Sequence, residues 1–192
     1  MRQGKPTPMK TAFITQSLAV LLSLTMVSGQ EPTTPAKLPG RPETKLTLDF
    51  GADGKKAMTF PASPYVTQKG WITILAGEEY TVEFDIIGGQ PKNLRYVADP
   101  NQKAKPGTGR LTVSLTQSKD GTCLIRSAES PKPLAMRCLT QSYGENKFQQ
   151  ARLDPVGDLS QGDGWGKAVC SVMLGEIRFA DEPNKGEKAP AK

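Results

Sequence analysis

Three aspartates lie in a glycine-rich segment near the C-terminal end of the sequence. Asp154, Asp158 and Asp163 fall within residues 154–166, which read DPVGDLSQGDGWG. Carboxylate oxygens are ligands that calcium prefers, and glycines let backbone carbonyls converge on one ion. The spacing fits no calcium-binding loop, however, and aspartate and glycine are also common turn formers. We therefore favour a structural Ω-type loop and retain the three aspartates as candidate metal ligands.

The same segment holds Trp165 between two glycines. An indole ring could stack on a sugar or a peptide, which makes Trp165 the candidate ligand contact. The favoured interpretation is a hydrophobic anchor that packs this loop beneath the strands.

Glu83 and Asp85 are the pair of carboxylates whose spacing could support catalysis. In an extended strand both point to the same face, about 7 Å apart, near the separation found in inverting glycosidases. Two acids on a solvated strand face are common, and the sequence contains no histidine, the commonest general base. We assign no catalytic or cofactor-binding residue and expect a protein that is not an enzyme, with a carboxylate-based hydrolase as an alternative.

The sequence contains three cysteines, Cys123, Cys138 and Cys170. If two strands fold back symmetrically about residues 130–131, Cys123 and Cys138 lie opposite each other, within reach of a disulfide. Closing a loop of about 15 residues would stabilise the fold by roughly 3 kcal/mol. We predict this disulfide, with Cys170 as a buried free thiol. A bridge from Cys123 or Cys138 to Cys170 is the alternative, because sequence does not determine connectivity.

The N-terminal residues 1–29 have the features of a secretory signal peptide. A basic start with Arg2, Lys5 and Lys10 precedes an apolar run over residues 18–27, and small residues follow. The apolar run has about ten residues, half of the roughly 20 that span a bilayer, so we expect cleavage and no membrane span. The predicted location is periplasmic or extracellular, where disulfides persist.

Composition divides the remainder of the chain. Residues 30–43 carry four prolines and predict a flexible linker, and the charged residues 181–192 predict a disordered tail.

The predicted signal peptide holds three basic and no acidic residues, so its removal lowers the net charge from +6 to +3. Basic residues are scattered among acids, which disfavours nucleic acid as a partner. Those between Lys92 and Arg110 are interpreted as a solvated hairpin loop.

Residues 44–180 show a periodicity of two, which is typical of strands. Tyr80, Val82, Phe84 and Ile86 alternate with polar residues, and Leu111, Val113 and Leu115 repeat the pattern. We predict a single all-β domain of about ten strands, an antiparallel β-sandwich with a β-barrel as the alternative. The other expected strands cover residues 46–50, 58–60, 71–76, 94–98, 122–127, 134–141, 147–153 and 167–179, with a bend or bulge at Gly175 in the last.

Export, an all-β pattern and the absence of catalytic groups together indicate a function in binding. We expect a non-catalytic binding or accessory module of the cell envelope, presenting loops such as 99–109 and 154–166 to a protein or glycan. The alternative is a structural or inhibitory protein that pairs with a protein partner, for example along a sheet edge.

Overall fold

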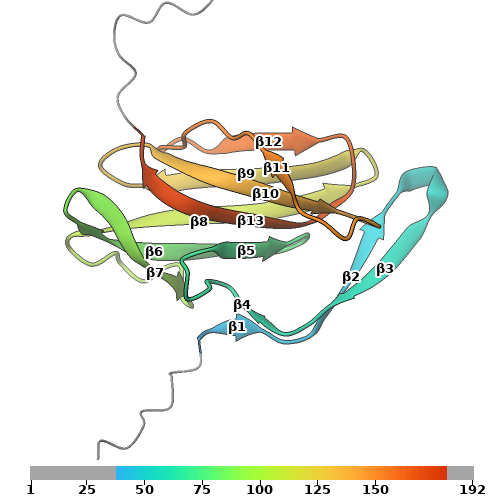
Figure 1. Ribbon diagram of the computed structural model, residues 1–192, viewed down its shortest axis with the longest axis horizontal. Coiled ribbons are helices and arrows are strands. Elements are labelled where there is room, and N and C mark those ends of the chain that lie inside the picture. Colours follow the sequence, from blue (N-terminus) through green and yellow to red (C-terminus); the bar gives the residue numbers. More distant parts are fainter. Residues whose placement is uncertain (1–37, 181–192) are drawn as a thin grey trace, which may run out of the picture. The chain divides into compact units, whose positions relative to one another are not determined.

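The computed structural model describes residues 38–180, and nearly all regular structure in this range is β (Figure 1). A short 3₁₀ helix, η1 (Gly51–Asp53), lies between β2 and β3. The strands in chain order are β1 (Gly40–Arg41), β2 (Thr44–Asp49), β3 (Lys55–Phe60), β4 (Ser63–Pro64), β5 (Ile72–Leu75), β6 (Glu79–Ile87), β7 (Gln90–Val97), β8 (Thr108–Ser118), β9 (Gly121–Glu129), β10 (Leu134–Ser142), β11 (Gln149–Ala151), β12 (Gln161–Trp165) and β13 (Val169–Phe179).

Two larger antiparallel sheets pack together, so the predicted sandwich is confirmed. One sheet has the order β12-β9-β8-β6-β7, and the other has the order β11-β10-β13-β5. Strands β2 and β3, both expected from the sequence, form a separate hairpin, and β1 pairs with β4 (Figure 1).

The core follows from the alternation read in the sequence. Leu111, Val113 and Leu115 of β8 are fully buried, whereas Thr112 and Ser114 between them are partly exposed. Each such buried leucine or valine contributes roughly 1.5–3 kcal/mol relative to an exposed position. They join one hydrophobic cluster with residues of the facing sheet, such as Ile74 of β5 and Val172 of β13.

The predicted hairpin between residues 123 and 138 is wrong. Strand β9 pairs with β8 and β12, whereas β10 pairs with β11 and β13, so the connection over residues 130–133 crosses from one sheet to the other. Residues 130–131 are turn residues that suit a hairpin and a crossing between sheets equally well. Tertiary packing, which the local sequence does not encode, decides between the two.

The predicted disulfide between Cys123 and Cys138 is therefore also wrong. Cys123 is partly exposed between the buried residues Thr122 and Leu124, whereas Cys138 is fully buried in the other sheet. The alternative bridges to Cys170 are not formed either, because all three cysteines are free and the Cys170 thiol donates to the Gln141 carbonyl at 3.0 Å.

Two predicted boundaries also change. Strand β1 falls within the predicted linker, because the Arg41 side chain is buried and anchors this segment. Within the predicted Ω-type loop, residues 161–165 form β12, an edge strand paired with β9.

The predicted signal peptide, residues 30–37 of the linker and the predicted tail lie outside the described residues. Within residues 38–180, no helix has the length and hydrophobicity required to cross a membrane.

We predict that the three thiols differ in reactivity toward a disulfide reagent in the folded protein. Cys123 reacts first because it is partly exposed, whereas burial raises the pKa of Cys138 to about 12 and removes the reactive thiolate. Burial also raises the pKa of Cys170. Thiol titration before and after unfolding in urea measures this order. Cys123→Ser should remove the fast phase alone, and a Cys123–Cys138 bridge found by mass spectrometry would contradict the arrangement.

Candidate functional site

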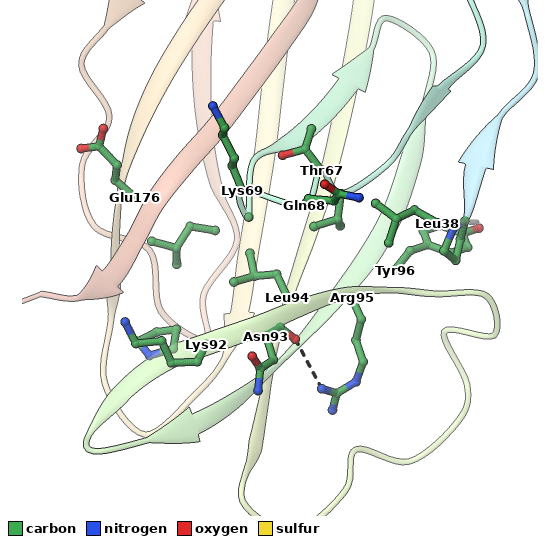
Figure 2. Close-up of a pocket in the computed structure, with 15 residues that line it drawn as sticks. Leu38, Thr67, Gln68, Lys69, Lys92, Asn93, Leu94, Arg95, Tyr96 and Glu176 are labelled. Atoms are coloured by element: carbon green, nitrogen blue, oxygen red, sulfur yellow. Dashed lines mark hydrogen bonds between the residues drawn. The ribbon is translucent and has the colours of Figure 1, made fainter. Parts of the chain in front are cut away.

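The candidate site is a groove of about 510 Å³ formed where β7 approaches β13 (Figure 2). One wall comes from β7, another from the turn at residues 66–70 before β5, and a third from Leu38 and Pro39. Glu176 and Ile177 of β13 complete the lining. The groove thus combines segments that are far apart in the sequence.

Two β-bulges create the groove. In β7, Asn93 and Leu94 occupy the space opposite the single residue Phe84, between the pairs Glu83–Arg95 and Asp85–Lys92. An equivalent irregularity in β13 places Glu176 and Ile177 opposite Met136 of β10. The extra residue in each strand bends it locally and redirects its side chains.

Both bulges contain strained backbone. Asn93 and Glu176 each have φ of 52°, and they are the non-glycine residues with positive φ in the described part of the chain. Such a conformation costs on the order of 1–3 kcal/mol and is often retained where function requires it. Asn93 is stabilised by its amide, which donates to Asp85 Oδ2 at 2.9 Å. The strain points to this groove as the site.

Gly175 permits the second bulge, as the sequence suggested. A Cβ atom at this position would lie 2.4 Å from the indole ring of Trp71. The ring therefore packs directly against the backbone of β13, next to Glu176. Only glycine allows this approach without movement of the ring or the strand.

The groove has an apolar centre with charged groups at one end. Leu94 lies between Lys92 and Glu176 on one side and Leu38 and Tyr96 on the other (Figure 2). Tyr96 stacks on Tyr65 with ring centroids 4.3 Å apart, which fixes its position. Neither Lys69 nor Lys92 forms an ion pair with a described residue, so both ammonium groups can meet a ligand.

Arg41 fixes the N-terminal wall of the groove. Its side chain is buried, and Nε donates to Glu78 Oε1 at 2.7 Å. Nη1 donates to Ser63 Oγ at 3.1 Å, and Nη2 donates to the Thr73 carbonyl. Burying the Arg41 guanidinium without partners would cost free energy, so these three partners determine where the N-terminal segment can lie. Leu38 and Pro39 are thereby held beside the groove.

Glu83 and Asp85, the predicted carboxylate pair, are both engaged by arginine. Glu83 is buried and accepts from Arg95 Nη2 at 2.6 Å and from Arg110 Nη2 at 3.4 Å, while Arg95 Nη1 also donates to Asp85 at 2.7 Å. Burial raises the pKa of Glu83, but the two arginines outweigh it and leave the pKa lowered. Hydrogen bonds from Asn93 and Arg95 lower the pKa of Asp85. A general acid needs a raised pKa, so this geometry does not favour the hydrolase alternative.

The three candidate metal ligands do not converge. Asp163 accepts from Arg126 Nη2 at 2.6 Å, and Asp154 contributes its backbone carbonyl to the same guanidinium at 3.2 Å. Asp158 is exposed. In residues 38–180 no group of histidine, cysteine, aspartate or glutamate side chains is arranged to hold a metal ion. The Asp163 carboxylate and the Asp154 carbonyl instead bind the fully buried Arg126.

Trp165 ends β12 and is partly buried against the core. It also lines a separate cavity of about 400 Å³ at the β8–β9 turn, with Thr122 and Gly166. The hydrophobic anchor favoured from the sequence agrees with this packing, and Trp165 lies outside the groove.

Sequence analysis did not identify the groove. Gly175 gave a signal for one bulge, but nothing local in the sequence marks Asn93 or Glu176 as strained. Comparison of the chain with protein-family models, curated proteins and solved structures found no match.

We predict that Gly175→Ala lowers the free energy of unfolding by about 1–3 kcal/mol, because the added methyl group must displace the Trp71 ring or the strand. Gly164→Ala is the matched control, since a Cβ there has no neighbour within 4 Å. Its effect should stay within about 0.5 kcal/mol. Urea unfolding measures both variants, and equal stabilities would contradict the close packing at Gly175.

We predict that Glu83→Gln lowers the free energy of unfolding at pH 7 by about 1–3 kcal/mol, since the buried Arg110 and the part-buried Arg95 lose their charged partner. The folded-state pKa of Glu83 is lowered, so its stabilisation is present above the ordinary glutamate pKa. It is lost as the pH falls through the folded-state pKa. The difference between the two proteins should therefore shrink in acid.

Asp120→Asn is the control for this experiment, because Asp120 pairs with Lys119 on the surface and its side chain is 78% exposed. Urea unfolding across the acid range should show little change for this variant. A pH-independent difference between Glu83→Gln and the unmodified protein would argue that Glu83 is not an ionised partner.

Proposed function

We propose that this protein is an exported, non-catalytic binding module of the cell envelope, periplasmic or secreted, that holds a glycan or protein partner in the groove between β7 and β13. The observation that carries the proposal is the coincidence of both strained residues, Asn93 and Glu176, in one cavity. Backbone strain of this kind persists only where the surrounding structure holds it in place. A preformed groove requires little ordering when a ligand binds.

The chemistry of the groove supports binding rather than reaction. Glu176, the one carboxylate among the described residues that line it, pairs with Arg137 at 2.9 Å. The remaining lining groups are apolar, amide, hydroxyl or cationic side chains. Such a mixture of an apolar floor and a few polar groups is typical of ligand-binding pockets.

A second candidate function is strand addition by a protein partner at β12. This edge strand has no proline, lysine or bulge, and its sequence is QGDGW. The opposite edge, β7, carries Pro91, Lys92 and a bulge, features that discourage edge pairing. If β12 is the binding site, changes in the groove should not affect the partner.

We predict that Leu94→Arg abolishes ligand retention, because a long charged side chain fills the centre of the groove. The full chain is immobilised and exposed to envelope extract, and retained glycan and protein are quantified by composition analysis and mass spectrometry. Ile87→Arg is the matched control, since Ile87 is 54% exposed on β6 and does not line the groove.

Retention that is lost in Leu94→Arg and kept in Ile87→Arg supports the groove as the binding site. Circular dichroism of each variant confirms that the sandwich is intact. Equal retention by both variants would refute the groove and leave the β12 edge as the next surface to alter.

A further inference from the structure

A second hollow adjoins the groove at Glu176. Its volume is about 830 Å³, and it is lined by residues of β10, β11 and β13 and by the segment that follows β11. Glu176 lines both hollows, so the β13 bulge forms the boundary between them. Together they provide a longer surface than one sugar ring or one side chain would fill.

The two hollows carry an excess of positive charge. The whole chain has 25 basic and 19 acidic residues, whereas within residues 38–180 the only carboxylate that lines either hollow belongs to Glu176. Arg95 also lines the groove, but Glu83 and Asp85 neutralise it. In the second hollow Arg137 is likewise neutralised, by Glu176. Lys69 and Lys92 of the groove and Arg152 of the second hollow give the excess of positive charge.

The chemistry changes from one hollow to the other. Val66, Leu94 and Ile177 give the groove an apolar floor, which suits the C–H faces of sugar rings. The cation that the second hollow offers is Arg152, whose planar guanidinium fork matches carboxylate geometry. A ligand that satisfies both hollows is an extended chain with apolar ring faces and repeated carboxylates. Polyphosphate lacks the ring faces, and neutral glycans lack the charge.

We propose that the ligand is a carboxylate-bearing polysaccharide of the polyuronate type, which runs from the groove across the β13 bulge into the second hollow. This inference rests on the proposed binding function and names its ligand class. Leu94 contacts a ring face, Lys69 and Lys92 meet carboxylates in the groove, and Arg152 meets carboxylates in the second hollow.

The test measures binding of polygalacturonate to the full chain by titration calorimetry, with neutral dextran, dextran sulfate and inorganic polyphosphate as comparison probes. Lys69→Glu/Lys92→Glu should weaken polygalacturonate binding by about tenfold or more, because attraction at the groove becomes repulsion. The charge-matched control Lys45→Glu/Lys55→Glu alters exposed lysines of the β2–β3 hairpin and should change affinity by less than about twofold.

Arg152→Glu tests the second hollow. It should weaken binding of polygalacturonate but leave binding of a galacturonate dimer nearly unchanged, since a dimer fills only the groove. Equal loss in the groove variant and the charge-matched control would overturn the inference, as would tighter binding of dextran sulfate or polyphosphate. If polygalacturonate fails to bind while Leu94→Arg still abolishes retention from envelope extract, the ligand class is wrong and the binding function stands.

Discussion

The structure depends on the neutralisation of guanidinium groups inside the sandwich. Arg126 occupies an inward-facing position of β9, between the buried residues Leu124 and Ala128, and it is 0% exposed. A buried charge without a partner would cost several kcal/mol. The Asp163 carboxylate, at 2.6 Å, and the Asp154 carbonyl, at 3.2 Å, are the partners of the Arg126 guanidinium. These contacts hold β12 and the segment before it against β9.

The need to pair arginine side chains with acceptors also positions the walls of the groove. Arg41 carries the N-terminal segment to Glu78, and Arg95 joins β7 to Glu83 and Asp85 across the bulge. Arg110 adds a second cation to Glu83 from β8, so three strands of one sheet share a charge network centred on the buried Glu83. These contacts stabilise a backbone that contains the strained residue Asn93, and they make the groove a fixed part of the fold.

The sequence predicts those features that local periodicity determines. The alternation in β6 and β8, the two strands within residues 44–60 and the irregularity at Gly175 could all be predicted, because each depends on neighbouring residues. The crossing of the chain from β9 in one sheet to β10 in the other could not be predicted. Residues 130–133 have the composition of an ordinary turn, which fits a hairpin and a crossing equally well. Strand β12 was missed because its glycines and aspartate resemble a loop, and its partner Arg126 lies 37 residues from Asp163.

The bulge in β7 separates the charges that build the fold from those that face a ligand. In a regular strand, Lys92 and Leu94 would point to the same face, and Arg95 to the other. The extra residue at Asn93 and Leu94 resets this alternation opposite Phe84. Arg95 extends away from Gln68 and Lys69 toward its carboxylates, while Leu94 faces the cavity (Figure 2). One added residue thus lets a single edge strand supply both an ion pair with the buried Glu83 and a binding surface. A regular alternating strand would have to place them on fixed opposite faces.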